Sequence, residues 1–358
     1  MLRRSRVSRP PLASLGVLLL ALSPAAQAQR CGDVITQSTV LRQDVICPST
    51  LQPGLTVRGD GVVLDLGGHT ISMAPDSAIA AGVHAPPGVL VEGSASVLVA
   101  NGQIVNRGKF LGFQGIRFQA SERGTASALT IRGFENGVVL VDSPATTIIE
   151  NTFEVDWPIQ FLSASPYVLP VSGSPATRIV ANRVDGGVTG GARFVDVLDL
   201  SGDVVVEGND ARRLGLGILA PNVRGLQVLR NRLSGCSEIG CVGVFIYSSA
   251  GSAVGGVIEG NLFEGFSTAI SVASQHAIVR GNEMYGAGVA GPAIAIGGMI
   301  NPFASPPAFE RSLITGNVVV DYALGLRFHG LARSNDGRGN TWIRVAVPVE
   351  DYGRWNRW

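Results

Sequence analysis

The sequence predicts an all-β chain wound into a single-domain parallel β-helix, a solenoid of roughly 11 to 12 coils with three short strands in each. Two recurring phrases and the composition support this fold class. Gly contributes 47 of the 358 residues and charged residues only 15%, a balance that favours short strands with tight bends. The absence of a sustained 3.6-residue hydrophobic period disfavours leucine-rich and helical repeats.

The first phrase is an apolar residue, two further residues, Asn, one residue and a second apolar residue. It is centred on seven asparagines: Asn151, Asn182, Asn209, Asn231, Asn261, Asn282 and Asn317. The steps between them are 31, 27, 22, 30, 21 and 35, which suits coils that carry loops of different length. We expect each Asn to adopt a left-handed bend between two short strands and to join a ladder of side-chain amides.

The second phrase is a small residue followed by two apolar residues with one residue between them, as in Gly115 to Phe118. This alternation sends one side chain inward and the next to solvent. The predicted outward row of this sheet is Arg117, Val139, Gln160, Gly217, Phe245, Ser271, Ala295 and Arg327, with Tyr247 and His329 two residues further along. Neighbouring members of such a row lie about 4.8 Å apart.

The N-terminus reads as a signal peptide over residues 1–28. Four arginines precede an apolar run from Leu12 to Leu22, which is followed by Ala26-Gln27-Ala28. Cleavage near Ala28 would export the protein to the periplasm, the cell surface or the medium. The Arg3-Arg4 pair leaves a twin-arginine route open. We expect no membrane span in the rest of the chain.

Without the four leader arginines, 24 basic and 27 acidic residues remain, a charge of about −3 that indicates no nucleic-acid partner. We expect a monomer with an N-terminal cap over 29–53, the β-helix over 54–349 and an aromatic cap over 350–358. In the last segment, Trp355 and Trp358 would join Trp342 in covering the end of the solenoid, which would otherwise expose core and strand edges.

Four cysteines in an exported chain indicate disulfides. Three connectivities are possible, and we predict the local one, Cys31 with Cys47 and Cys236 with Cys241. The first bond would restrict the unfolded chain by about 3 kcal/mol and tie down the first coil. A metal site is the alternative, although no histidine lies near either pair.

The start of the mature chain resembles a known superfamily. Cys31-Gly32, Asp44, Cys47 and the run from Leu64 to Ile71 are similar to the opening of secreted right-handed parallel β-helix repeat proteins of the pectin-lyase-like superfamily. The resemblance extends from Cys31 to Val349. It implies a right-handed helix whose functional face is the outer surface of one sheet. Members include polysaccharide lyases, glycoside hydrolases, epimerases, carbohydrate-binding modules and adhesive surface proteins.

Two aspartates are candidates for chemistry on this face. If Val195 and Val197 point inward, Asp196 faces outward, and Asp199 can do so after a bulge. Two carboxylates on a groove floor would serve as acid and base or nucleophile, or would hold a cation. The alternative is that both are solvated or pair with arginines such as Arg193, Arg212 and Arg213.

The catalytic patterns of the superfamily are mostly missing. Polygalacturonase-like members share an Asp-Asp pair and a Gly-His-Gly, whereas this chain has Phe328-His329-Gly330, where an exposed strand-end histidine is the simpler interpretation. Many lyases of the fold use Lys or Arg beside calcium. The single lysine is Lys109, so Arg117 is the candidate base. We predict no required cofactor and no dedicated metal site, with bound calcium left open.

Aromatic residues provide further candidates for sugar contacts. Trp157, Phe161 and Tyr167 cluster around an insertion from Glu154 to Ser174, and Phe245 and Tyr247 lie near the outward row. Exposed rings stack on the apolar faces of sugars, but the same rings could cover the core, and the alternation places Phe161 inside. The predicted substrate-binding residues are Gln160, Trp157, Tyr247, Phe245, Arg327 and His329.

The sequence leaves three functions open. The first is binding or processing of a polysaccharide or cell-surface glycan, as a hydrolase or lyase if the protein is an enzyme. The second is a non-catalytic surface or structural solenoid, which an outward row containing Val139, Gly217 and Ala295 would suit. The third, an autotransporter-like passenger, is disfavoured because no membrane-barrel segment is recognised after the solenoid.

Overall fold

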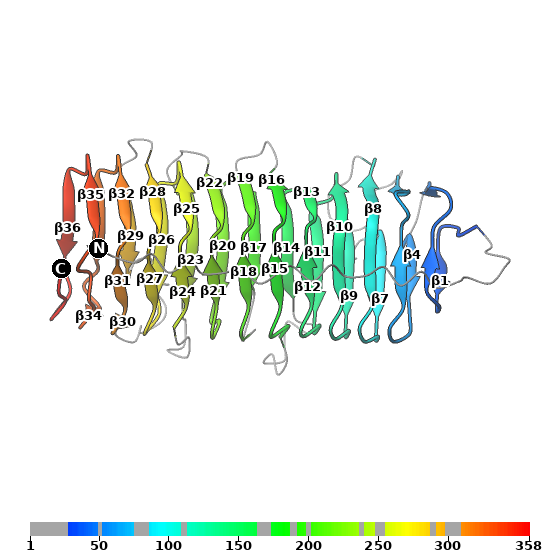
Figure 1. Cartoon of the computed structure of the whole chain (residues 1–358), viewed down its shortest axis with the longest axis horizontal. Coiled ribbons are helices and arrows are strands. Elements are labelled where there is room, and N and C mark those ends of the chain that lie inside the picture. The colour runs from blue at the N-terminus through cyan, green and yellow to red at the C-terminus, as the bar shows by residue number, and fades with distance from the viewer. Residues whose placement is uncertain are drawn as a thin grey trace, which may run out of the picture.

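The computed structural model describes residues 28–48, 52–74, 86–108, 113–162, 173–186, 192–197, 202–235, 240–247, 255–286, 291–297 and 309–358. These residues form 36 strands and no helix, stacked as successive rungs along a rod (Figure 1). The pairing between rungs is parallel throughout, so the protein is a single right-handed parallel β-helix, as the sequence predicts. The proposed signal peptide lies almost wholly outside the described residues and stays a prediction.

One side of the rod is a sheet of 13 parallel strands, called the long sheet below. In spatial order it comprises β1 (Asp33–Ile35), β4 (Leu55–Val57), β7 (Val89–Glu92), β9 (Gln114–Gln119), β11 (Asn136–Val141), β14 (Trp157–Leu162), β17 (Arg193–Val197), β20 (Leu216–Pro221), β23 (Val242–Tyr247), β26 (Thr268–Ala273), β29 (Pro292–Ile296), β33 (Leu324–Phe328) and β36 (Val347–Asp351).

The second side is a ladder of short strands, called the first ladder: β2 (Thr39–Val40), β5 (Val63–Asp65), β8 (Leu98–Asn106), β10 (Thr125–Arg132), β12 (Thr147–Ile149), β15 (Arg178–Val180), β18 (Val205–Glu207), β21 (Gln227–Leu229), β24 (Val257–Glu259), β27 (Ile278–Arg280) and β31 (Leu313–Thr315). The strands β8 and β10 are long enough to bend around the corner and continue into the third side.

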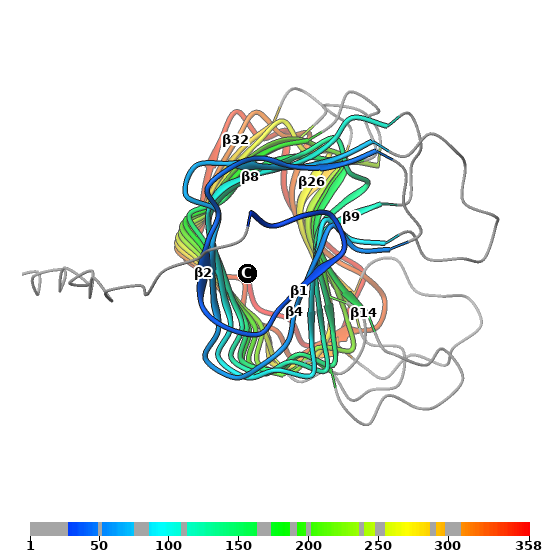
Figure 2. The same cartoon turned by 90° about the vertical axis from the view of Figure 1, so that its right-hand side faces the viewer.

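The third side, the second ladder, runs through β3 (Val45–Cys47), β6 (Thr70–Met73), the far halves of β8 and β10, β13 (Thr152–Glu154), β16 (Arg183–Asp185), β19 (Asp210–Leu214), β22 (Arg232–Gly235), β25 (Leu262–Glu264), β28 (Glu283–Tyr285), β32 (Val318–Val320) and β35 (Thr341–Ile343). A separate pair joins β30 (Phe309–Glu310) to β34 (Ala332–Arg333). Viewed along the rod, the strands of successive rungs superimpose (Figure 2).

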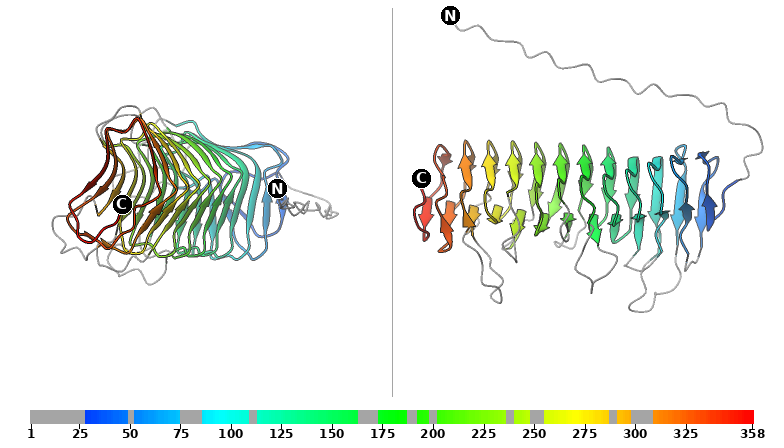
Figure 3. Two further views of the ribbon diagram at one scale, coloured as in Figure 1. Left: turned by 60° about the vertical axis from the view of Figure 1, so that its left-hand side comes forward. Right: turned by 90° about the horizontal axis from the view of Figure 1, so that it is seen from below.

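The long sheet has one or two more rungs than the 11 to 12 coils expected from the sequence. The reason lies at the ends. The strand β1 lies inside the predicted N-terminal cap, 29–53, and β36 crosses the predicted boundary between the β-helix and the C-terminal cap at residue 349. The first described rung and the last lie at opposite ends of the rod (Figure 3).

Inward side chains of all three sides fill the centre. Each rung contributes fully buried aliphatic or aromatic groups, among them Phe118, Phe153 and Phe263. Burial of one such side chain stabilises the fold by roughly 1.5 to 3 kcal/mol, so the repeated inward columns supply the main driving force. Phe161 is 1% exposed and belongs to this core, as the alternation predicts.

The seven predicted ladder asparagines align on one corner, between the first and second ladders. Each is at most 2% exposed. From Asn151 to Asn317, every side-chain Nδ2 donates to Oδ1 of the next Asn at 2.8 to 3.0 Å, and the backbone N–H donates to the same oxygen. Asn340 accepts the last of these bonds. The sequence missed it because Gly337 stands where the phrase has an apolar residue.

The conformational role expected of these asparagines is wrong. The positive φ angle belongs to the residue before each Asn, such as Glu150 (58°), Arg230 (53°) and Gly260 (64°), and to none of the seven asparagines. Oδ1 accepts two hydrogen bonds and Nδ2 also donates to a carbonyl of the preceding rung, for example from Asn231 to Val206. Asn is therefore required for its amide, and the left-handed turn falls on its neighbour.

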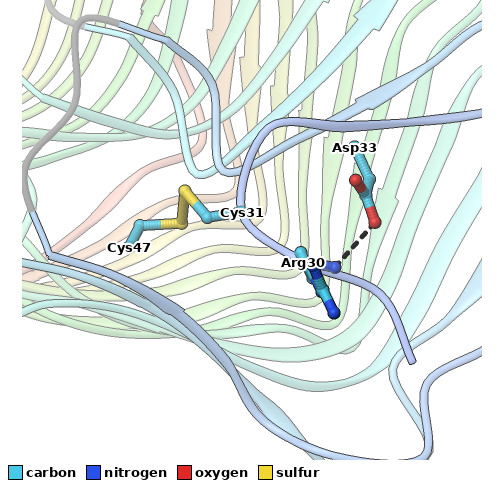
Figure 4. The surroundings of a disulfide bond; sticks show 4 residues. All are labelled: Arg30, Cys31, Asp33 and Cys47. Atoms are coloured by element: carbon cyan, nitrogen blue, oxygen red, sulfur yellow. Dashed lines mark hydrogen bonds between the residues drawn. A yellow bond between two sulfur atoms is a disulfide. The ribbon is translucent and has the colours of Figure 1, made fainter.

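The Cys31–Cys47 disulfide is present, with the two Cα atoms 5.3 Å apart (Figure 4). It joins the turn just before β1 to the end of β3 and so ties the first rung across its own cross-section, as predicted. Cys241 is buried, and no described cysteine is free. Its predicted partner, Cys236, lies outside the described residues, so that bond stays a prediction.

The three C-terminal tryptophans do not act together as a cap. Trp342 packs on the core because it pairs with Val319 of the preceding rung in an inward column. Trp355 and Trp358 are 74% and 64% exposed. Trp355 has a φ of 58° between two residues bridged to the preceding rung, so it does not continue the inward alternation. The expectation that both rings cover the core is therefore wrong.

Candidate functional site

The register of the long sheet defines its outward row. Directly paired residues along it are Leu90, Arg117, Val139, Gln160, Asp196, Leu219, Phe245, Ser271, Ala295, Arg327 and Glu350. Seven of the eight predicted members lie in it, and Asp196 takes the outward place expected if Val195 and Val197 point inward. Parallel pairing places neighbours about 4.8 Å apart along the rod.

Gly217 is the one wrong member, and Leu219 takes its place. Both Gly215 and Gly217 precede an alternating apolar run, and the sequence of one coil does not decide which of them begins the phrase. In the structure Gly217 lies against Gly243 of the next rung. A Cβ atom on Gly217 would come within 2.2 Å of the Gly243 carbonyl oxygen, so only glycine fits there.

Asp196 is the most unusual side chain of the row, because it is an outward carboxylate that is only 2% exposed. Its Oδ2 accepts a hydrogen bond from Arg193 Nη1 at 2.8 Å, while Oδ1 has no partner. Burial raises the pKa of Asp196, and the hydrogen bond and charge of Arg193 oppose that shift. A buried carboxylate with one satisfied oxygen is a recognised sign of a functional site.

The neighbours of Asp196 hold it in place. Arg193 is only partly buried and lies over the ring of Trp157, with 5.2 Å from guanidinium carbon to ring centroid. Gln160 pairs with Asp196 across the sheet and is 8% exposed. A tryptophan, a cation and a carboxylate therefore stand in contact on β14 and β17. Arg212 and Arg213, the other partners considered, pair instead with Asp210 and Asp185.

An apolar surface continues from this group toward the C-terminal end. Phe245 and Tyr247 are both partly exposed, with ring centroids 5.0 Å apart at an interplanar angle of 32°. Leu219 separates Phe245 from Asp196 in the row. We call this area the β14–β23 patch, and it consists of Trp157, Arg193, Asp196, Leu216, Leu219, Val242, Phe245 and Tyr247. Its outward aliphatic members, including Leu216 and Val242, were not anticipated from the sequence.

Arg117 lies outside this patch. It is three rungs from Asp196, about 14 Å along the rod, with buried Val139 and Gln160 between them. Its buried Nε has no hydrogen-bond partner, and burial lowers the pKa of Arg117 against the opposing charge of Glu92. Glu92 itself accepts two hydrogen bonds from Arg58. The structure therefore does not bring Arg117 together with Asp196.

Arg327 and His329 also lie apart from the patch, three rungs beyond Phe245. Arg327 Nε donates to Glu350 at 2.7 Å, and the Tyr352 hydroxyl donates to the other oxygen of the same carboxylate at 2.6 Å. Burial and the charge of Arg327 lower the pKa of His329. These residues form a separate polar group near the last rung.

Every internal gap between the described ranges opens beside a strand of the long sheet, on one side or both. Asp199, Tyr167 and Lys109 fall in these gaps, so the predicted Asp196–Asp199 pairing lies outside the described residues. Among the residues that are described, no three His, Cys, Asp or Glu side chains gather as a metal site.

A hollow of about 450 Å³ lies at the other end of the molecule. Arg30, Asp33 and Thr39 are among its lining residues, around β1. Five strands of the long sheet, from β4 to β14, separate this hollow from β17. It therefore has no part in the β14–β23 patch.

No protein-family model matches the sequence, and no curated protein matches it. Solved structures do. One is DFA-IIIase from Arthrobacter chlorophenolicus A6 without its lid in complex with GF2, with a TM-score of 0.56 at 16% identity over 88% of each chain. Another is the Dettilon tailspike protein, with a TM-score of 0.53 at 15% identity over 87% of this chain and 62% of that one.

The chain shares the right-handed parallel β-helix fold with these structures. At these identities the likeness concerns the architecture, and the side chains of the site have to be interpreted from their own chemistry. In the part of the chain that the structure describes, no helix has the length and apolar character needed to cross a bilayer.

Proposed function

We propose that this is an exported protein that binds a polysaccharide or cell-surface glycan on the outer face of the long sheet, with the β14–β23 patch as the contact surface. The observation that carries the proposal is the partly exposed Phe245–Tyr247 pair on the same face as the Arg193–Asp196 pair. Sugars present apolar ring faces and polar hydroxyl edges, so they need both kinds of surface close together.

Export is supported by the Cys31–Cys47 disulfide, since such bonds persist in oxidising compartments. The leader-like segment before Gln29 supports it independently. We propose cleavage near Ala28 and a monomeric mature protein. We propose that no cofactor is required, and the experiment below tests for a dependence on calcium.

Hydrolysis is the second candidate function, and the raised pKa of Asp196 favours it. A carboxyl group with a raised pKa keeps its proton to higher pH than an ordinary aspartate and can donate it to a leaving glycosidic oxygen. A second carboxylate would then act as base at about 6.5 to 9.5 Å or as nucleophile near 5 Å. Asp199 is our candidate for that role. A lyase using Arg117 as base is a weaker candidate, because Arg117 lies three rungs away.

The test uses the mature protein with a panel of neutral and uronic-acid polysaccharides, with and without calcium. Binding is followed by titration calorimetry, and turnover by reducing ends and by the absorbance of unsaturated products. We expect binding that Phe245→Ala weakens about tenfold, the effect of losing one ring contact. Tyr285→Ala is the matched control, because Tyr285 is a 39% exposed aromatic residue on the second ladder.

Each remaining outcome assigns the protein to one of the alternatives. Turnover lost in Asp196→Asn, with affinity retained, identifies a hydrolase. Unsaturated products that disappear in Arg117→Gln identify a lyase. If none of the glycans binds, the proposal is wrong and the non-catalytic structural solenoid is the better interpretation.

A further inference from the structure

The β14–β23 patch is elongated along the rod. Asp196, Leu219 and Phe245 are consecutive Cα partners on β17, β20 and β23, so their side chains follow one line parallel to the axis. Two rung spacings separate the first from the last, about 10 Å. A single sugar ring is shorter than this, so contact with both ends requires a chain of sugars.

The two ends of this line differ in what they can recognise. At β23, the Phe245–Tyr247 rings present an apolar surface for the face of a sugar ring. At β17, Oδ1 of Asp196 is a buried acceptor without a donor, and Arg193 offers partly exposed N–H groups beside it. Leu219 lies between the two ends and adds aliphatic surface. A ligand that stacks at one end and donates a hydroxyl at the other satisfies both.

Charge further narrows the class of ligand. Arg193 is the one cation among the residues that define the patch, and Asp196 already pairs with it at 2.8 Å. A uronate would bring a second anion next to a carboxylate whose free oxygen needs a donor. A neutral sugar would bring hydroxyl donors instead.

We propose that the ligand is a neutral oligosaccharide or a neutral stretch of polysaccharide that lies parallel to the solenoid axis across β17, β20 and β23. One sugar stacks on the Phe245–Tyr247 pair, and another hydrogen-bonds to the Arg193–Asp196 pair. This inference rests on the proposed function and adds to it the direction, minimum length and charge of the ligand.

The test is a titration of the full-length mature protein with two matched series of increasing length, neutral oligosaccharides and oligouronides. For the neutral series we expect affinity to rise until the chain reaches both ends of the patch and then to level off. Oligouronides of equal length should bind at least tenfold more weakly. Phe245→Ala should remove the dependence on length while short neutral ligands keep their affinity, and Tyr285→Ala should change neither.

Two results would overturn the inference and leave glycan binding in place. One is an affinity that does not change with length, which would show a single-sugar site. The other is tighter binding of oligouronides, and loss of that preference in Arg117→Gln would place the ligand toward β9. If neither series binds, the proposed function fails as well, so the failures are distinguishable.

Discussion

The asparagine corner and the outer face of the long sheet both bury polar side chains, but they satisfy them differently. On the corner, each Asn from Asn151 to Asn317 uses its amide oxygen and nitrogen in hydrogen bonds to neighbouring rungs. On the long sheet, four strand residues have buried polar atoms without a partner: Gln114, Arg117, Asn136 and Asp196. The described chain contains only two others, Ser274 and Arg333.

This difference separates the structural part of the molecule from its candidate functional part. A satisfied buried amide contributes stability and repeats in every rung, whereas an unsatisfied buried group reduces stability and persists where it has another role. The side of the rod with these unsatisfied groups therefore lies opposite the regular, hydrogen-bonded corner.

The largest predicted effect is on the corner. Asn231→Leu would leave the Asn209 backbone N–H without its acceptor and the Val206 carbonyl without its side-chain donor. It would also remove one hydrogen bond each from Asn209 Nδ2 and Asn261 Oδ1. With about 1 to 3 kcal/mol for each buried group left unpaired, we expect a loss on the order of 4 kcal/mol in the free energy of unfolding. Chemical denaturation measures it. A loss below about 1 kcal/mol would mean that the ladder of asparagine amides does not support the fold.

The next effect concerns the first rung, which lies outside the ladder. The Cys31–Cys47 bond closes the chain there, and its removal in the double variant Cys31→Ser with Cys47→Ser should lower stability by about 3 kcal/mol. Limited proteolysis should then cut first near β1 to β3. Cleavage that begins in the middle of the rod would contradict a role confined to the N-terminal end.

A smaller effect is expected at Asn340, the last member of the ladder of asparagine amides. Asn340 is only partly buried and has no asparagine beyond it to receive its amide, although it still accepts from Asn317 and donates to Ile314 and Gly337. Solvent can replace part of this bonding, so Asn340→Ala should lower the free energy of unfolding by about 1 kcal/mol. A loss equal to that of Asn231→Leu would show that burial does not determine how much each asparagine contributes to the free energy of unfolding.

The smallest effect in stability, but the most specific, concerns Asp196. Because burial raises its pKa, the folded protein holds this proton more tightly than the unfolded chain. Its contribution to stability therefore falls as the pH rises from about the ordinary value of 3.8 through the raised pKa. Asp196→Asn should remove this dependence and leave stability at neutral pH unchanged or higher, as measured by denaturation at several pH values.

Asp321 is the matched control for that experiment. It pairs with Arg344 on the surface, and the pKa of Asp321 is lowered by this partner. Its contribution is present above its ordinary pKa and is lost as the pH falls through the lowered one, so Asp321→Asn should change the pH dependence with the opposite sign. The same sign in both variants would contradict the burial of Asp196.

The sequence predicted the regular parts of the molecule because their cause is local and repeated. The Asn phrase located the corner, and alternation placed Phe161 inside and Asp196 outside. Alternation could not decide whether Gly215 or Gly217 begins the second phrase, because the two are two residues apart and fit the alternation equally well. The choice depends on the contact of Gly217 with the next rung. The left-handed turn was assigned to Asn, since the preceding position has no single residue type, as Glu150 and Gly260 show.

The candidate site was only partly predictable for a related reason. Phe245, Tyr247 and Asp196 were identified from their place in or beside the row, and Trp157 from the aromatic cluster near the insertion from Glu154 to Ser174. That three rungs separate Arg117 from Asp196, whereas two separate Asp196 from Phe245, depends on the number and register of the coils between them. Because the loops differ in length, the number of coils between two residues cannot be obtained from their separation in the sequence.

The most direct test is a crystal structure of the mature protein with the tightest-binding neutral oligosaccharide. We expect the sugar chain along the outer face of the long sheet, parallel to the rod, with one ring over Phe245 and a hydroxyl within hydrogen-bond distance of Asp196 or Arg193. A chain bound on the first or second ladder, or across the rod away from β17 and β23, would contradict it.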